Sequence, residues 1–335
     1  LGPAGATIGL SGFEGPGGVV YENDSITGDL LQFPNDEVFT ATIPASDREG
    51  LDLVPGGGTY RFRFRIFSGS ASELEVRAIV LNRPGGTVDE GRLDLNIFLA
   101  AGLGISVQDA PTDDRLQTAL AEADRIFSQK GLRLGAVTYY ALSDPAFDDV
   151  GSYSEFATLV EESAAAIETR LNLFMVRTAI GGGVLGVAAR IAGPARNGTD
   201  VSGVMVDYDF GSATTMGYVT AHELGHFIGL LHTVEQNGSH DMIDDTAECP
   251  ASGTDATCPT EGNGYLMHWR VLSSEPVITD GQARVILGHP LMAEGMEPLL
   301  VPFSSAVRVL AVVSAPPELP DGWCGCVGCS ASDGK

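Results

Sequence analysis

All six histidines of this 335-residue chain lie between His222 and His289. Three of them share one segment, His222-Glu223-Leu224-Gly225-His226-Phe227-Ile228-Gly229-Leu230-Leu231-His232. Residues four apart on a helix share one face, so the imidazoles of His222 and His226 can chelate one metal ion, and zinc accepts imidazole nitrogens. Glu223 lies beside that face and can act as a general base on a nearby water. The segment therefore predicts a zinc site with a base next to it.

Gly229 explains how the third histidine could join the same ion. On a continuous helix, His232 would lie about 9 Å beyond His226 along the axis, whereas two nitrogens on one zinc lie within about 3.5 Å of each other. Glycine readily adopts the positive φ that ends a helix and redirects the chain. We therefore expect the helix to end near Gly229 and His232 to return to the metal.

The composition argues against several other classes of protein. The chain has 44 acidic and 19 basic residues, which gives a formal net charge of −25, and a nucleic-acid-binding surface needs lysine and arginine instead. No apolar run approaches the ~20 residues that span a bilayer, so we expect no membrane-spanning segment. Apolar residues make up 44%, too many for a disordered chain. This profile is typical of acidic, secreted globular proteins.

The hydrophobic pattern divides the chain into three parts. In residues 1–85, Gly- and Pro-rich turns separate strand patterns, above all at 59–67, where arginine alternates with apolar residues on what we interpret as a solvated sheet face. These residues predict a small all-β sandwich. Residues 86–300 alternate strand and helix patterns, which predicts an α/β (α+β) domain. We expect strands at 93–100, 132–140, 173–178 and 201–207. We expect helices at 113–130, with Thr112 as N-cap, at 153–171, and at about 214–230 for the active-site helix. Residues 301–335 predict a C-terminal strand and a Cys/Gly-rich tail.

All five cysteines follow position 248. Cys249 and Cys258 flank a short loop and would form a disulfide in an oxidising compartment, the alternative being two reduced thiols. Cys324, Cys326 and Cys329 have no fourth ligand nearby, which favours an anchoring or sorting tail over a metal site. Because the chain begins with Leu1, we interpret it as a processed or trimmed product.

The histidine segment resembles the signature of the metzincin clan of zinc metallopeptidases, His-Glu-x-x-His-x-x-Gly-x-x-His followed by a methionine-containing turn. Asn263-Gly264-Tyr265-Leu266-Met267-His268-Trp269 resembles that turn. The resemblance implies a mixed, twisted sheet with an active-site helix. It also implies zinc bound by His222, His226 and His232 above Met267.

Within the clan, the chain is most similar to the pappalysin-like (M43) family. Asp241-Met242-Ile243-Asp244-Asp245-Thr246 resembles the Asp-x-x-x-Asp-Thr segment of that family. Calcium is therefore implied as a second cofactor, with Asp241, Asp244 and Asp245 as candidate ligands. The alternative is a solvated acidic loop.

The stretch Gly186-Val187-Ala188 resembles the upper-rim strand of the M43 family, to which an extended peptide would add as a further strand. Two positions depart from the expected pattern. Trp269 stands where several metzincin families carry a tyrosine that can hydrogen-bond the reaction intermediate, and Ala247 replaces a proline. The resemblance therefore predicts the zinc ligands and the base, but not the transition-state stabilisation or the shape of the loop.

Together, these features predict a secreted or cell-surface zinc endopeptidase, bacterial in origin, that cleaves protein or peptide substrates. Glu223 would take a proton from water and pass it to the leaving amine, and the acidic surface would favour basic peptides. One alternative is a degenerate metzincin that serves as an extracellular binding or adhesion protein, which the intact Glu223 opposes. Another is a zinc hydrolase with a non-peptide substrate. Residues 1–85 are either a pro-segment or an accessory domain.

Overall fold

The computed structural model of the protein describes its central part and several strands elsewhere in the chain. The described residues are 7–14, 20–22, 31–33, 40–42, 61–68, 79–80, 90–180, 183–235, 240–246, 264–269, 275–293 and 299–300. The predictions for Leu1, Ala247, the five cysteines and the tail lie outside these residues. A helix of the length and apolar character needed to traverse a bilayer does not occur in the described ranges.

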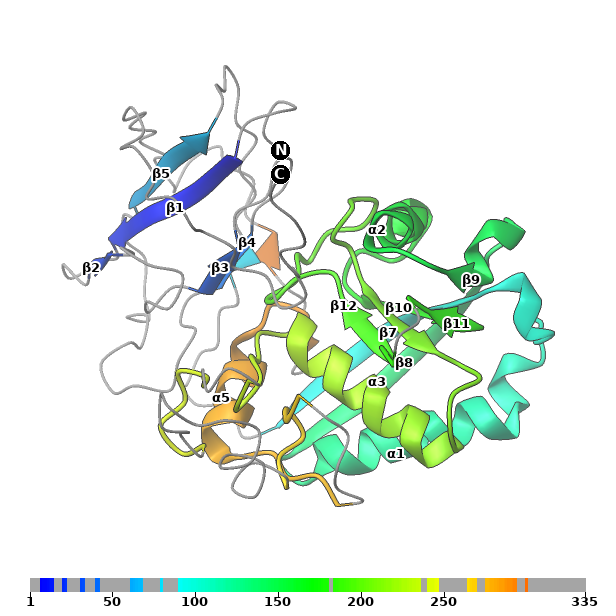
Figure 1. The fold of residues 1–335 in the computed structure, drawn as a ribbon. Helices are drawn as coiled ribbons and strands as arrows, with labels where there is room; N and C mark the ends of the chain where they lie inside the picture. The colour runs from blue at the N-terminus through cyan, green and yellow to red at the C-terminus, as the bar shows by residue number, and fades with distance from the viewer. Residues whose placement is uncertain are drawn as a thin grey trace, which may run out of the picture.

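A mixed six-stranded sheet organises the central part (Figure 1). Its strands are β7 (Gly91–Leu99), β8 (Leu132–Ala141), β10 (Leu171–Val176), β12 (Gly186–Ala188), β13 (Val204–Asp207) and β14 (Met292–Ala293). Their order is β12-β13-β10-β7-β14, with β8 also paired to β7. Strands β13, β10, β7 and β8 run parallel, whereas β12 and β14 are antiparallel to their neighbours. The sheet is mixed, as expected, and the strands predicted near 93–100, 132–140, 173–178 and 201–207 are present.

Helices cover both faces of this sheet. They are α1 (Asp114–Ser128), α2 (Tyr153–Glu161), α3 (Ala213–Phe227) and α5 (Asp280–Gly288). Alternate side chains of a strand point to opposite faces. On β7, Leu95 and Ile97 accordingly join the core formed with α1, α3 and α5, whereas Phe98 joins the core formed with α2. The expected α/β arrangement follows from this central strand, which is buried on both sides.

Short elements complete the central part. They are the 3-10 turns η2 (Ala101–Leu103), η3 (Ala110–Thr112), η4 (Pro145–Phe147) and η5 (Glu162–Ala165), and the paired strands β9 (Asp149–Val150) and β11 (Thr178–Ala179). None of them carries a residue predicted for the site.

Two helix boundaries differ from the sequence predictions. The N-cap of α1 is Asp113, which accepts a hydrogen bond from the Leu116 N–H at 2.8 Å, because Thr112 belongs to the preceding 3-10 turn. Helix α2 ends at Glu161 rather than near 171. Beyond it, the side-chain amides of Asn96 and Asn197 donate to the carbonyls of residues 167 and 166, which holds that segment in a non-helical path.

The described strands of the N-terminal part form small antiparallel sheets. Strand β1 (Thr7–Glu14) pairs with β2 (Val20–Glu22) and β5 (Arg61–Ser68), β3 (Leu31–Phe33) pairs with β4 (Thr40–Thr42), and β6 (Ile79–Val80) pairs with β15 (Leu299–Leu300). On β5, Arg61 and Arg63 are exposed and Phe64 is buried, the pattern expected of a half-buried strand. The β-sandwich itself stays a prediction.

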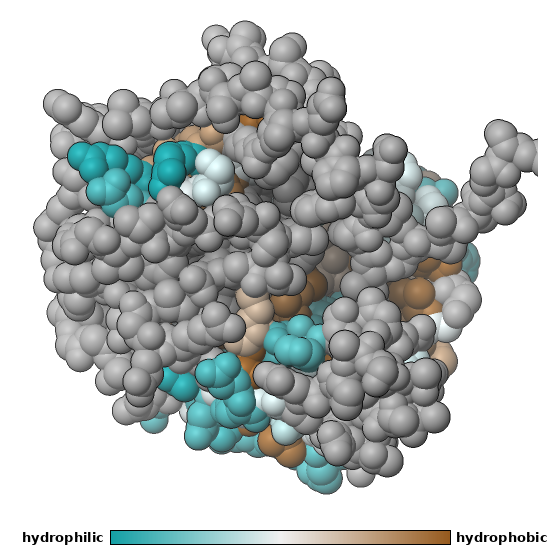
Figure 2. All heavy atoms as spheres, turned by 60° about the vertical axis from the view of Figure 1, so that its left-hand side comes forward, coloured by the Kyte–Doolittle hydropathy of each residue, from teal (hydrophilic) through white to brown (hydrophobic). Residues whose placement is uncertain are grey.

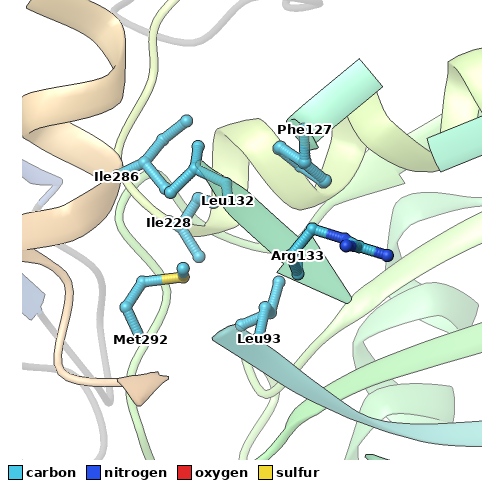
Figure 3. Close-up of a pocket in the computed structure, with 7 residues that line it drawn as sticks. All are labelled: Leu93, Phe127, Leu132, Arg133, Ile228, Ile286 and Met292. Carbon is cyan, nitrogen blue, oxygen red and sulfur yellow. The ribbon is translucent and has the colours of Figure 1, made fainter. Parts of the chain in front are cut away.

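An apolar gap lies where α1, α5, β7 and β8 meet. It is lined by Leu93, Phe127, Leu132, Arg133, Ile228, Ile286 and Met292, which Figure 3 shows around a narrow space. Six of these seven side chains are apolar, and the gap has no room for a water molecule. It is a packing feature rather than a binding site. On the face seen in Figure 2, hydrophobic side chains of the described residues lie beside hydrophilic ones.

Candidate metal centre

Helix α3 carries the first two histidines of the segment and is buried from residue 216 to residue 227. Its start is fixed by Ser212, whose hydroxyl accepts the N–H of Thr215. Gly217 permits close packing on α1, because a Cβ there would lie 2.5 Å from the carbonyl oxygen of Ala119. The imidazoles of His222 and His226 share one face, with ring centroids 4.6 Å apart.

The helix ends before the third histidine. Gly229 has a φ of 115°, its N–H donates to the carbonyl of His226, and the Leu230 N–H donates to the carbonyl of Gly225. This left-handed C-terminal turn redirects the chain. The Nε2 atom of His232 then lies 3.0 Å from that of His226 and 3.2 Å from that of His222. The structure therefore brings the three histidines together through the turn expected at Gly229.

Each of the three imidazoles uses Nδ1 to contact an oxygen acceptor. The contacts are His222 with the carbonyl of Leu266 at 2.7 Å, His226 with the carbonyl of Leu230 at 2.7 Å, and His232 with Oε1 of Glu235 at 2.8 Å. These oxygens only accept, so each Nδ1 carries the proton and donates it. In the neutral form, a ring with its proton on Nδ1 keeps a lone pair on Nε2.

The three Nε2 atoms face one another, and their chemistry fits a zinc ion. Burial lowers the pKa of His222 to about 3 and that of His226 well below its usual value, and the nearby His232 adds to both shifts. When all three rings are neutral and carry their protons on Nδ1, no Nε2 atom can donate to another, so the three Nε2 lone pairs face one another. Zinc bound at about 2.0–2.1 Å in tetrahedral geometry separates two nitrogens by about 3.3 Å. In the described part of the chain, no other group of three His, Cys, Asp or Glu side chains gathers in this way.

Glu223 lies against the edge strand β12 and is only 7% exposed. Burial raises the pKa of this carboxyl to about 8, and a hydrogen bond from the Ala188 N–H acts in the opposite direction. Gly186 allows this contact, because a Cβ there would lie 2.5 Å from Cγ of Glu223. A cation held by the histidines would lower the pKa of Glu223 towards neutrality, the range that suits a general base.

Among the described residues, strand β12 pairs with β13 along one edge and with no strand along the other, open edge. The N–H of Ala189 donates to Gly203, and the carbonyl of Leu185 accepts from Asp207. Main-chain groups alternate in direction along an antiparallel strand. Those of Gly186 and Ala188 therefore face the open edge, on the side of Glu223.

Met267 packs against α3. Its side chain is fully buried, and its Sδ would lie 2.7 Å from a Cβ placed on Gly225, the residue before His226. The Met267 carbonyl accepts the N–H of Thr233 at 3.0 Å. The methionine turn thus supports both the helix and the segment that carries the third histidine. Beyond it, the ring of Trp269 stacks on that of His268.

The three predicted calcium ligands do not converge. Asp241 is buried, its Oδ1 accepts from the hydroxyl of Thr246, and its Oδ2 is buried with no hydrogen-bond partner. Asp245 is exposed and accepts the N–H of Gly281, and Asp244 is also exposed. No cluster of three carboxylates forms among these residues. Calcium binding stays a prediction.

Of the remaining histidines, His268 is close enough to His222 to help lower the pKa of that ring, whereas His240 and His289 have partners elsewhere. His240 contacts the carbonyl of Asp241, and buried His289 contacts the carbonyl of Gly193. Sequence reasoning missed two residues that support the centre. One is Glu235, which could have been sought as a carboxylate near the third histidine. The other is Tyr218, whose hydroxyl donates to the carbonyl of Leu266 at 3.2 Å but which in the sequence resembles an ordinary core residue of the helix.

Comparison with known families agrees with this geometry at the level of the clan. Residues 106–273, about half of the chain, match the sequence profile of metallo-peptidase family M12. This family is reprolysin-like and of the metzincin type, so the expected clan is confirmed, whereas the closer likeness to the M43 family stays a prediction. A search of the curated proteins finds no match.

Proposed function

The chain belongs to metallo-peptidase family M12, and on this premise we propose that it is a secreted zinc-dependent endopeptidase. The observation that carries the proposal is the meeting of three Nε2 lone pairs beside a buried carboxyl, that of Glu223. Neutral imidazoles in this arrangement suit zinc. The adjacent carboxyl suits proton transfer.

His222, His226 and His232 would hold the metal, each through Nε2. When bound, zinc supplies Lewis acidity that polarises a carbonyl and lowers the pKa of water. Glu223 would then accept a proton from the attacking water and donate it to the leaving amine. Burial of this carboxyl beneath β12 keeps bulk water from competing for that proton.

We propose that an extended peptide binds as an added strand along β12. The support is the open edge, at which the main-chain groups of Gly186 and the carbonyl of Ala188 face outwards, while the Ala188 N–H is bonded to Glu223. Strand addition uses such groups for affinity and side-chain pockets for specificity. A bound peptide would lie directly over Glu223.

Several finer features complete the proposal. Calcium is proposed as a second cofactor held near buried Asp241, and the net charge of −25 would favour basic peptides. We also propose that residues 241–246 form a loop similar to that of the M43 family. Residues 1–85 would act as a pro-segment or an accessory domain.

The deciding experiment combines zinc analysis with cleavage of casein and a peptide library. We expect one zinc per chain and cleavage that stops when a chelator removes the metal. Zinc without any peptide cleavage would favour a hydrolase with another substrate. Absence of both would favour a binding or adhesion protein.

A further inference from the structure

The third histidine of the metal centre is held differently from the other two. His222 and His226 lie on a buried helix, and their Nδ1 atoms donate to main-chain carbonyls. His232 lies in a segment that is neither helix nor strand. Its Nδ1 donates instead to the side-chain carboxylate of Glu235, at 2.8 Å. Of the three acceptors, only Glu235 is ionisable.

The backbone between these two residues is anchored at both positions. The N–H of Thr233 donates to the carbonyl of Met267 at 3.0 Å, and Val234 forms an isolated β-bridge with His240. Thr233 and Val234 are both buried. These contacts fix the main chain next to Glu235, and therefore limit the positions from which its carboxylate can contact the ring of His232.

The pair is also partly shielded from water. The side chain of His232 is 13% exposed and that of Glu235 is 23% exposed. Exposed ion pairs contribute little because water and salt screen them, but a pair with this burial lies in a lower effective dielectric. The negative charge of Glu235 therefore acts on the imidazole at close range.

We propose that Glu235 is a positioning residue that orients and polarises His232 for zinc. Its carboxylate keeps the proton on Nδ1, so Nε2 presents its lone pair to the metal, and its charge makes that nitrogen a stronger donor. The inference rests on the proposed function, because it takes zinc as the ion held by the three histidines. Glu235 contacts the far side of the ring rather than the reacting atoms, so its role is positioning and not catalytic.

Two substitutions separate the parts of this role. Glu235→Gln keeps an oxygen acceptor of nearly the same shape but removes the charge, and Glu235→Ala removes both. Glu155→Gln is the matched control, because Glu155 accepts the N–H of Gly151 at 2.7 Å on helix α2, away from the histidines. The test measures zinc affinity of the full chain by competition with a zinc-binding dye. The melting temperature of each metal-free variant reports its folding.

Loss of a carboxylate behind a metal-binding histidine typically weakens metal affinity by about 10- to 100-fold. We expect the zinc affinity to fall about 10-fold in Glu235→Gln and about 100-fold in Glu235→Ala. The affinity of Glu155→Gln should equal that of the native protein. With cobalt in place of zinc, the visible d–d absorption of Glu235→Ala should differ from that of the native protein, which a purely structural role would not produce.

Native zinc affinity in Glu235→Gln would overturn the proposal. A melting temperature that falls in the metal-free Glu235→Gln variant while affinity is unchanged would also overturn it, since the residue would then act on the fold alone. Failure of the native chain to bind zinc would contradict the proposed function itself, and the assignment of Glu235 would fall with it.

Discussion

His222 and Leu266 are joined by a hydrogen bond of 2.7 Å between the imidazole Nδ1 on helix α3 and a main-chain carbonyl of the methionine turn. The hydroxyl of Tyr218, one turn earlier on α3, lies 3.2 Å from the same carbonyl and 3.2 Å from that of Tyr265. The orientation of the first histidine thus depends on a segment 44 residues away. Through these two hydrogen bonds, Tyr218 holds the methionine turn against helix α3.

Tyr218→Phe should weaken both the fold and the metal centre. The change removes one buried hydroxyl, which typically costs about 1 kcal/mol in the free energy of unfolding, and it frees the carbonyl of Leu266 to move relative to His222. We expect a severalfold loss of zinc affinity in a dye-competition titration. Tyr208→Phe is the control, because it removes a similar bond, to Asp113, away from the site. Equal zinc affinities for the two variants would contradict the role of Tyr218.

Glu223→Gln should abolish peptide cleavage while zinc is retained. The amide has almost the same shape as the carboxyl but cannot accept a proton from water, and a general base typically contributes about 10²- to 10⁴-fold in rate. Cleavage of a fluorogenic peptide gives the rate, and atomic absorption gives the zinc content. Glu155→Gln should leave both unchanged. Full activity in Glu223→Gln would remove this residue from the mechanism.

Gly186→Ala should lower the turnover number without loss of zinc. The new methyl group would lie 2.5 Å from Cγ of Glu223, so the carboxyl must shift, and a misplacement of about 1 Å can cost about 100-fold in rate. Gly288→Ala is the control, since a Cβ there meets nothing within 4 Å. If Gly186→Ala retains the native turnover number, Glu223 has more freedom beneath β12 than its packing indicates.

The metal centre was the most predictable feature of this molecule, because its geometry is local. The spacing of His222 and His226 follows from helical periodicity, and Gly229 marks the turn that returns His232. The parallel strands were equally accessible, since strands such as β10 are largely apolar runs buried on both faces. Each of these signals occupies a single stretch of sequence.

Features that depend on tertiary contacts could not be predicted. Nothing in the sequence pairs Tyr218 with the carbonyl of Leu266, and Glu235 resembles any other acidic residue of a chain with 44 of them. The non-helical segment after α2 is held by the side chain of Asn96, which is 71 residues from its partner carbonyl. Closeness in sequence can also mislead. Asp241, Asp244 and Asp245 are neighbours along the chain, but their carboxylates do not come together in the structure.

Calcium should raise the melting temperature of the zinc-loaded protein if the site near Asp241 exists. The physical reason is that the buried Oδ2 of this residue has no hydrogen-bond partner, and a bound cation would satisfy it. Differential scanning calorimetry with calcium or with EGTA measures the effect, and Asp241→Asn should eliminate it. Identical melting curves in both solutions would favour the solvated acidic loop.

Acid should destabilise the protein in part through His289. This histidine is buried at the end of α5, where burial lowers its pKa from the usual 6.5 to about 4, a shift partly offset by its bond to the carbonyl of Gly193. A depressed histidine pKa means that the unfolded chain binds the proton more tightly than the folded one. The stability due to neutral His289 is therefore complete above about pH 6.5 and is lost as the pH falls towards 4, at no more than about 1.4 kcal/mol per pH unit.

Denaturant unfolding of the native chain and of His289→Gln from pH 7.5 to 4 isolates this contribution. Other groups titrate in the same range in both proteins, so the difference between the two curves reports His289. We expect the native protein to be the more stable at pH 7.5, because glutamine replaces a well-packed ring beside Phe227, and the difference to shrink as the pH falls. A difference that stays constant across this range would show that the folded protein accommodates the charged imidazole.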